Sequence, residues 1–383
     1  MPRPPGFAPA TLEMPGAVYS PFADRMASHP GPLFPLHVGD TWMEPFESGR
    51  MESLRTAEHP GMHRYSDTRG LPGLIDSLVE KVRQRNGLVC ERESILVGAG
   101  ATGSLATAVG AIAAPGDEVL ILSPFWPLIR GIVQTFRARP VEVPFYDRVD
   151  SAEAAVEAVR ERTSSRSVAL YVSTPSNPTG RVLPESWLAA LAELAREEDL
   201  WLLSDEVYEE YVYRGDHVSM GRFAPERTIS TYSFSKTYGM AGNRVGYMVA
   251  PPPVVEQARK IGTHTFYHAP TAAQLSAERV LRDADAWVAR AREQYRAAGE
   301  KTAAALGLAA PEGSTFLFVD VSSRLDERGL DGLLADCFEQ GVLLAPGASA
   351  GRDYASWVRL CYTAVPPEAM SDAASRLARC LGP

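Results

Sequence analysis

The chain has 383 residues, of which 45% are hydrophobic, and this is enough apolar material for one large domain and a smaller one. Its formal net charge of −9 argues against a nucleic-acid partner, because no basic surplus exists to neutralise phosphates. The absence of a long apolar run, of a signal-like N-terminus and of any CxxC pair among four cysteines predicts a soluble, cytoplasmic protein without a disulfide framework.

Prolines are frequent in residues 1–40, which is typical of an extended arm. From about residue 70, the pattern predicts helices that alternate with strands. The expected helices are 74–85, 102–113, 128–137, 151–163 and 184–198, and the expected strands are 94–97, 118–123, 141–143, 168–172, 200–204, 228–232 and 245–249. This alternation indicates a mostly parallel sheet with helices on both faces.

A different pattern follows, with an Ala- and Arg-rich helical segment at 271–300, a strand at 316–321, a helix at 330–339 and strand-like pieces to 363. We therefore predict an α/β fold with a large domain over residues 41–270. A smaller α+β domain would be built from residues 271–383 together with the N-terminal arm, 1–40.

Four polar segments follow predicted strands, at the sheet edge where open α/β sheets bind ligands. They are GAGATG (98–103), NPTG (177–180), DEVY (205–208) and SFSK (233–236). The glycines of the first would let backbone N–H groups approach a phosphate at the positive end of the following helix. That segment also fits the GxGxxG dinucleotide fingerprint, but the next strand ends in Ser123-Pro124 and not in the acidic residue that a nicotinamide cofactor requires.

Lys236 is one of only four lysines, and it lies among small hydroxyl residues with Arg244 eight positions further on. Its amine is suited to condense with an aldehyde while Ser233, Ser235 and Arg244 surround a phosphate, which is the chemistry of pyridoxal phosphate. The alternative is an exposed lysine in a polar turn. Asp205 is placed to keep the pyridine nitrogen of that cofactor protonated, although an aspartate that ends a strand is also a common cap.

Other residues gain roles if that cofactor binds. Asn177 and Tyr208 would hydrogen-bond the ring oxygen, although an Asn before Pro is also a turn former. Trp126 would stack on the ring or belong to the core. Arg359 lies in an apolar strand and needs a partner, either a substrate carboxylate or a structural salt bridge.

Taken in order, these segments resemble the class I and II aminotransferases of fold type I, the group that uses pyridoxal phosphate and includes aspartate aminotransferase. The resemblance runs from about Leu36 to Tyr362. It also includes Gly39-Asp40, Tyr65 before Gly70, PGDEV at 115–119 and GNRVG at 242–246.

The resemblance implies transfer of an amino group between an L-amino acid and a 2-keto acid by a ping-pong mechanism, through a Schiff base on Lys236. Lys236, Asp205 and Tyr208 would be catalytic. Tyr65 would reach the cofactor of a neighbouring subunit, which implies a homodimer with shared active sites. The implied cofactor-binding residues are Gly100, Ala101, Thr102, Trp126, Asn177, Asp205, Tyr208, Ser233, Ser235, Lys236, Arg244 and Tyr65, and the implied substrate-binding residues are Gly39, Asn177 and Arg359.

Two rival functions share this fold. The same residues would support another pyridoxal-phosphate reaction, namely a C–S or β-lyase, racemase, decarboxylase or oxidase. A cofactor-binding transcription regulator would instead need an N-terminal DNA-binding domain, for which the first 40 residues are too short.

The substrate is less well determined by the sequence. Ile129, Thr174 and the loop 346–351 depart from the family pattern, and the first and last of these are expected to reshape the substrate pocket. No arginine stands out as a partner for a distal acid. The aromatics around Trp42 and 266–267 either favour an apolar or aromatic substrate side chain or belong to an interface core, and the density of His264, Phe266, Tyr267 and His268 suggests that they line the pocket. The pairs His59/His63 and His264/His268 have metal-compatible spacing, but nearby Gly and Pro predict loops, and no metal site is expected.

Overall fold

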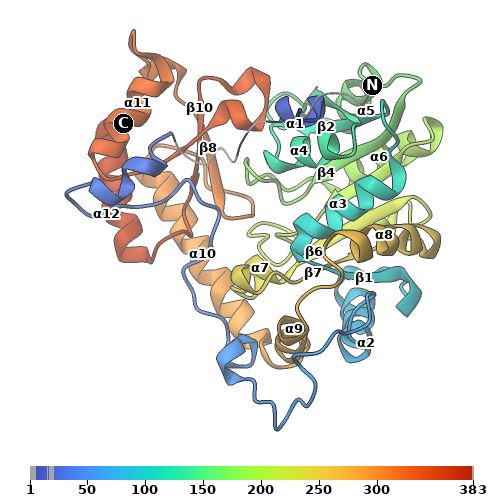
Figure 1. The fold of residues 1–383 in the computed structure, drawn as a ribbon. Helices are drawn as coiled ribbons and strands as arrows, with labels where there is room; N and C mark the ends of the chain where they lie inside the picture. Colours follow the sequence, from blue (N-terminus) through green and yellow to red (C-terminus); the bar gives the residue numbers. More distant parts are fainter. Residues whose placement is uncertain (1–5, 15, 17–20, 382–383) are drawn as a thin grey trace.

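The computed structural model describes residues 6–14, 16 and 21–381. Its main sheet has the strand order β1-β7-β6-β5-β4-β2-β3, and all neighbours are parallel except β7, which is antiparallel to both β1 and β6. The strands are β1 (Ile95–Gly98), β2 (Glu118–Ser123), β3 (Arg139–Pro144), β4 (Ser167–Ser173), β5 (Trp201–Asp205), β6 (Thr228–Ser233) and β7 (Gly246–Val249). The prediction of a mostly parallel α/β sheet is confirmed (Figure 1).

Helices cover both faces of this sheet because the side chains of each strand alternate between them. On β2, Val119 and Ile121 pack with α3 (Gly100–Ile112), α4 (Leu128–Thr135) and α8 (Pro252–Thr265), whereas Leu120 and Leu122 pack with α5 (Ala152–Arg160) and α6 (Glu185–Glu197). The α5 side is therefore a second, separate core layer.

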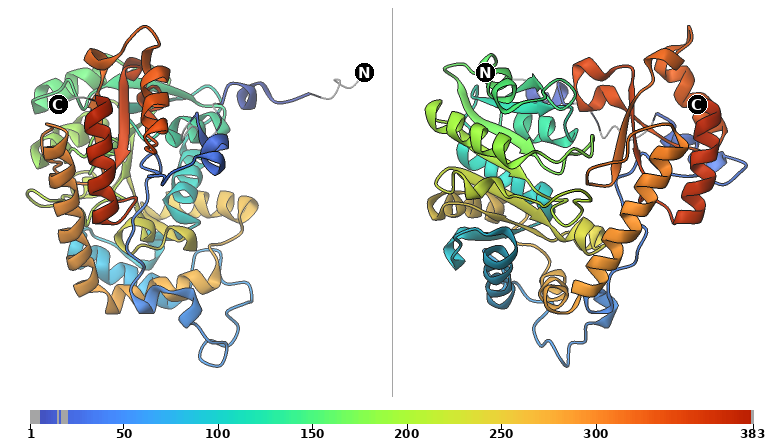
Figure 2. Two further views of the ribbon diagram at one scale, coloured as in Figure 1. Left: turned by 90° about the vertical axis from the view of Figure 1, so that its left-hand side faces the viewer. Right: turned by 180° about the vertical axis from the view of Figure 1, so that it is seen from behind.

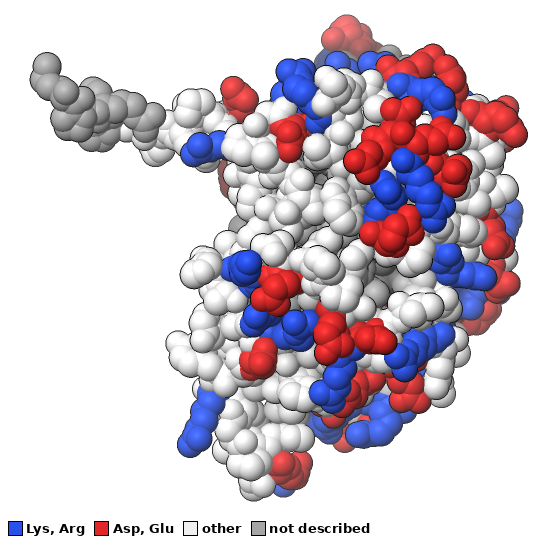
Figure 3. Space-filling model, turned by 90° about the vertical axis from the view of Figure 1, so that its right-hand side faces the viewer, with Lys and Arg blue, Asp and Glu red and all other residues white. Residues whose placement is uncertain are grey.

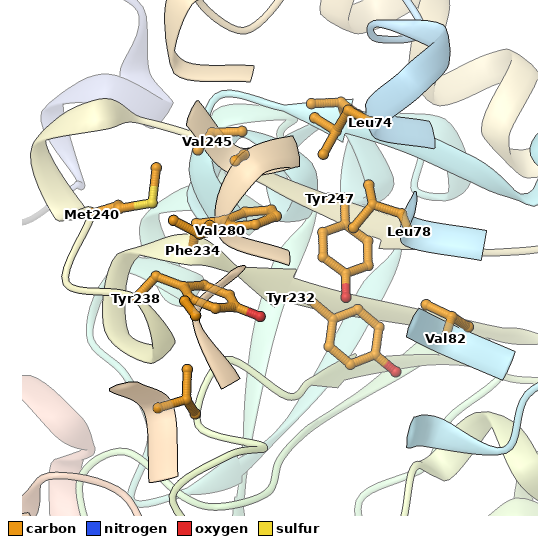
Figure 4. Packing of buried hydrophobic residues seen from close by; sticks show 14 of the residues in the cluster. Leu74, Leu78, Val82, Tyr232, Phe234, Tyr238, Met240, Val245, Tyr247 and Val280 are labelled. Carbon is orange, nitrogen blue, oxygen red and sulfur yellow. The ribbon is translucent and has the colours of Figure 1, made fainter. Parts of the chain in front are cut away.

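At the β1 end, the same face that carries α5 and α6 is covered by α2 (Pro72–Lys81) and α9 (Thr271–Asp283). Leu74 and Leu78 of α2 lie beside Tyr247 of β7 in the buried cluster of Figure 4. Tyr232 of β6 stacks on Tyr247 with ring centroids 4.9 Å apart. This packing supports the strand whose end leads into Lys236.

A second, antiparallel sheet has the order β8-β10-β9, formed by β8 (Phe316–Asp320), β9 (Ala345–Pro346) and β10 (Trp357–Cys361). It packs with α11 (Gly329–Glu339) and α12 (Pro367–Leu381). The long helix α10 (Asp285–Ala305) runs from this unit to α9, beside the β1 end of the main sheet (Figure 2). Phe34 of the N-terminal arm pairs with Val342 and is buried in this second core. Nearer the N-terminus, the arm's α1 (Pro9–Leu12) packs against α4.

Three features of the helices differ from the prediction. The helix expected at 271–300 is two helices, which meet at Ala284. α8 and α12 were not predicted. α8 begins in a run of prolines, which suggests a loop, although proline is well tolerated in a first helical turn. His264 consequently lies in the last turn of α8 and not in a loop.

The described residues contain neither a cluster of metal-ligating side chains nor a helix long and apolar enough to cross a bilayer. Figure 3 shows acidic and basic side chains interspersed on one face of the molecule. Residues 1–5, on which the expected absence of a secretory signal partly depends, lie outside the described residues.

Candidate active site

A cavity of about 440 Å³ lies where β4, β5 and β6 end and α3 begins. It brings together residues that are up to about 320 positions apart in the chain, from the arm, the main sheet and the second sheet. The predicted site residues that line it are Gly39, Ala101, Thr102, Trp126, Asn177, Asp205, Tyr208, Ser233, Ser235, Lys236, Arg244 and Arg359.

Lys236 lies on the short helix α7 (Phe234–Thr237), directly after β6. The hydroxyl of Ser233 accepts a hydrogen bond from the Ser235 amide at 3.1 Å and so starts this helix. The Lys236 amine donates to the backbone carbonyl of Gly39. Burial lowers the pKa of Lys236 against the smaller opposing effect of the Asp40 charge, and this favours the neutral, nucleophilic amine.

Asp205 is the last residue of β5, and its carboxylate is buried in the cavity wall. Its Oδ2 accepts a hydrogen bond of 2.6 Å from the hydroxyl of Tyr171 on the neighbouring strand. Burial raises the pKa of Asp205 to about 6, and the Tyr171 hydrogen bond opposes this rise. A bound cationic group would favour the charged carboxylate.

An anion-binding cradle forms at the start of α3. The helix has no side-chain cap, so the N–H groups of Ala101 and Thr102 in its first turn remain available to a ligand. Gly100 has φ +72° and approaches Arg244 so closely that an added Cβ would lie 2.5 Å from its Nη2. The Arg244 guanidinium is held by the carbonyls of Ala241, at 2.8 Å, and Ala99, at 3.4 Å. With Ser233 and Ser235, these donors fit a phosphate.

Arg359 reaches the cavity from β10 of the second sheet. Its two Nη atoms donate to the Asn177 side-chain oxygen at 3.1 Å and to the His37 carbonyl at 2.8 Å. The guanidinium lies 4.5 Å from the ring centre of Phe316. Burial and the Arg359 charge lower the pKa of His37 to about 4, so that His37 is neutral at physiological pH and Arg359 carries the positive charge.

Trp126 lines the cavity, and Tyr208 is buried against Phe316, with ring centroids 5.8 Å apart. Burial raises the pKa of the Tyr208 hydroxyl, so it serves as a hydrogen-bond donor and not as a charged group.

Several predicted residues do not line the cavity. Tyr65 is 84% exposed, and its ring packs against Tyr267 with centroids 5.0 Å apart. The aromatic and histidine residues at 264–268 are not among the lining residues, and Trp42 packs on Tyr295 at 4.6 Å. Ile129 is fully buried in the core, so that its neighbour Leu128, and not Ile129 itself, shapes the pocket.

Three supporting residues were not found by sequence reasoning. Tyr171 holds Asp205, and Tyr211 donates to the carbonyls of Lys236 and Thr237 at 2.8 and 3.1 Å. Glu206 is fully buried and accepts hydrogen bonds from the hydroxyls of Ser204, Ser219, Ser230 and Tyr232 and from the ring of His217. The one available signal was a tyrosine within an apolar strand, since a buried hydroxyl needs a partner.

The family described as aminotransferase class I and II matches residues 32–377. The aspartate/prephenate aminotransferase of Thermus thermophilus is 36% identical over 343 residues, which cover 86% of each protein. The aromatic-amino-acid aminotransferase 2 of Thermococcus litoralis is 30% identical over 344 residues, 86% of this chain and 87% of the relative. The solved structure of aspartate aminotransferase from T. thermophilus with maleate superposes with a TM-score of 0.88 at 31% identity and covers 98% of this chain and 100% of its own.

Proposed function

The chain belongs to the class I and II aminotransferase family and is a transaminase, and we propose that its cavity binds pyridoxal 5′-phosphate on Lys236. The observation that carries this proposal is one cavity that holds a buried amine of lowered pKa, a buried carboxylate and an anion-binding helix start. The cofactor, when bound, supplies an aldehyde for the amine and a protonated ring that accepts electrons from the substrate.

The residues around the cavity fit the three parts of that cofactor. Its phosphate would be held by Gly100, Ala101, Thr102, Ser233, Ser235 and Arg244. Its ring would be held by Trp126 on one face, by Asp205 at the pyridine nitrogen, and by Asn177 and Tyr208 at the ring oxygen. The Tyr171 hydrogen bond keeps the Asp205 carboxylate oriented, and the ring's positive charge would keep it ionised.

The substrate α-carboxylate would bind Arg359, whose guanidinium is already oriented by Asn177 and by the arm's backbone near Gly39. Lys236 Nζ contacts Gly39 O, so the amine lies at the substrate end of the cavity. From there it can take the α-proton of the amino acid and, on the same face, hand it back during the amino transfer.

The active unit is proposed to be a cytoplasmic homodimer in which Tyr65 completes the neighbouring subunit's site. Its exposed position, away from its own cavity, supports this arrangement. Each subunit would work as a large domain, 41–270, and a smaller one, 271–383 with the arm 1–40. The four free cysteines fit a reducing compartment.

The test is an absorbance spectrum of the purified protein before and after addition of L-amino acids, with Lys236→Ala beside it. A yellow band that amino acids convert, with release of one keto acid per site, is expected for the wild type and lost in the variant. Lys260→Ala is the matched control, because Lys260 is exposed on α8 and contacts Gln257. Release of ammonia and pyruvate without an acceptor would redirect the proposal to a β-lyase, and a protein that cannot be loaded with the cofactor would refute it.

A further inference from the structure

A second cavity, of about 460 Å³, lies directly beside the first. The two share Thr102, Pro127 and Leu128 as lining residues. Leu128 and Pro127 lie at the start of α4, immediately after Trp126. A ligand held in the first cavity therefore has this second space as a neighbour across a wall of three side chains.

The walls of the second cavity are mostly apolar, and apart from the shared Thr102 of α3 they come from three separate parts of the chain. Gly131 and Ile132 belong to α4, Met14 comes from the arm, Pro346 ends β9 and Ala348 lies in the turn after it. A Cβ added to Gly131 would be 3.5 Å from Met14 Cε, which places the arm over this part of α4. Gly131 on the α4 wall and Ala348 on the wall after β9 present little side chain to this space.

The cationic side chains that line the two cavities already have a proposed role or an ion-pair partner. Among the described lining residues, the cations are Lys236, Arg244, Arg359 and Arg130. The first three have roles in the proposed function. Arg130 Nη2 is 2.5 Å from Glu142 Oε1, and its guanidinium lies 5.0 Å from the ring centre of Phe125. A distal substrate carboxylate would have to compete with Glu142 for this arginine.

We propose that the second cavity receives the side chain of the amino donor, and that this donor is an L-amino acid with a bulky apolar side chain. The inference rests on the proposed function, which places the α-carboxylate on Arg359. The side of the first cavity that leads toward the second is lined by Leu128 and Pro127 together with Thr102, and its substrate end also presents Val38 and Phe316. An apolar side chain gains from leaving water along this path, whereas an acidic one loses its hydration beside Glu142.

The first measurement is kcat/KM of the cofactor-loaded dimer for leucine, methionine, phenylalanine, alanine and aspartate. Each buried methylene is expected to raise kcat/KM about fourfold, so leucine, with three more carbons, should exceed alanine by roughly 60-fold. Leucine, methionine and phenylalanine should all exceed aspartate. Preference for aspartate would overturn the inference and would assign Arg130 to the distal carboxylate.

Two variants fill the cavity from opposite walls, Gly131→Leu and Ala348→Leu. Each is expected to lower the ratio of kcat/KM for leucine to that for alanine by roughly tenfold or more. The ratio cancels any change in cofactor loading. Ala305→Leu is the matched control, because Ala305 lines a separate apolar cavity of about 310 Å³ between α10 and α12. An unchanged ratio in both filled variants, with thermal midpoints near that of the wild type, would overturn the inference.

Binding without turnover separates this inference from the proposed function. Calorimetry is expected to show that 4-methylpentanoate binds the loaded protein more tightly than succinate, and that Gly131→Leu removes this preference. Tighter binding of succinate would overturn the cavity assignment even if transamination is found. Conversely, absence of keto-acid release from every donor would refute the proposed reaction, while the preference for 4-methylpentanoate would still support the apolar cavity.

Discussion

Burial moves the pKa values of the two central groups in opposite directions, because it disfavours the charged form of each. The pKa of Lys236 falls and that of Asp205 rises, so both are closer to neutral than the same groups in water. For the lysine this favours attack on an aldehyde. For the aspartate, ionisation in the buried site costs free energy, and a bound pyridinium would offset that cost. Cofactor binding is therefore coupled to the charge of Asp205.

This coupling makes Asp205→Asn informative in the cofactor-free protein. Because the folded pKa of Asp205, about 6, lies above its ordinary value of 3.8, its contribution to stability is full below that ordinary value and is lost as pH rises through 6. The variant cannot ionise, so it should be more stable than wild type at about pH 8 by on the order of 2–3 kcal/mol, and equal to it near pH 4. Thermal unfolding across this range measures the difference, and transamination should fall at least about 100-fold. A stability difference that is independent of pH would contradict this account.

Arg359→Lys tests the carboxylate role separately from cofactor binding. A lysine keeps the charge but loses the two-point geometry that Asn177 and the His37 carbonyl orient. We expect kcat/KM to fall about 10- to 100-fold for every amino donor, with the cofactor spectrum unchanged. Arg352→Lys is the control, because the Arg352 side chain is 77% exposed. A spectrum altered as strongly as the rate would show that Arg359 serves the cofactor instead.

At the scale of elements, the start of α3 is the part of the cradle most sensitive to a single methyl group. Gly100→Ala would place a side chain at φ +72° and 2.5 Å from Arg244 Nη2, so the arginine must move away from the cradle. The dissociation constant of the cofactor should rise about tenfold or more, as measured by absorbance titration. Gly242→Ala, beside the same arginine but with open space around its Cβ, should leave the constant unchanged. Equal constants for both variants would show that Arg244 does not hold the phosphate.

The ends of β5 and β6 are joined by the buried carboxylate of Glu206. Burial alone would raise the pKa of Glu206, but the hydrogen bonds from His217, Ser204 and Ser219 lower it below its ordinary value. Its stabilising contribution is therefore full above its ordinary value of 4.5 and is lost as pH falls through the folded value.

Glu206→Gln replaces one acceptor oxygen with a donor amide and should destabilise the protein by about 2–4 kcal/mol at neutral pH. The difference from wild type should shrink as pH falls below 4.5, which unfolding in denaturant at several pH values would measure. The exposed Glu193→Gln should change stability by less than about 1 kcal/mol, because the Glu193–Arg196 pair lies at the surface. A Glu206→Gln variant as stable as Glu193→Gln would mean that the network does not hold the strand ends.

The strands of the main sheet and most of the residues that line the cavity could be predicted from the sequence for a physical reason. Buried strands are marked by their β-branched residues, and parallel strands bring their carboxyl ends to one edge, so Asp205 and Ser233 had to lie near each other. Sequence reasoning did not reach Tyr171 or Glu206, because their partners are set by the pairing of strands and not by local spacing. It also missed α8, whose opening prolines resemble a loop.

At the scale of the whole molecule, the N-terminal arm and the exposed ring of Tyr65 lie where they can contact more than one domain or subunit. The arm crosses from the second core, where Phe34 is buried, to α4 beside the second cavity. Tyr65 lies on the loop before α2, and its exposed ring rests on Tyr267 and not in its own cavity. A monomer would therefore leave one predicted cofactor contact unmade, which is the physical case for a dimer with shared sites.

Mixed dimers would measure whether the sites are shared. Tyr65→Asp would place a negative charge against the phosphate of the neighbouring site, and Lys236→Ala would remove the amine of its own site, so each homodimer should be inactive. When the two chains are coexpressed and pair at random, half of the dimers carry one site with both defects and one intact site, and activity should recover to about a quarter of wild type. Sedimentation with separately tagged chains would confirm the mixed species. Mixed dimers without activity would show that Tyr65 serves its own subunit, and an active Tyr65→Asp homodimer would show that it serves neither site. Recovery near a quarter, with both homodimers inactive, would place Tyr65 in the partner's site.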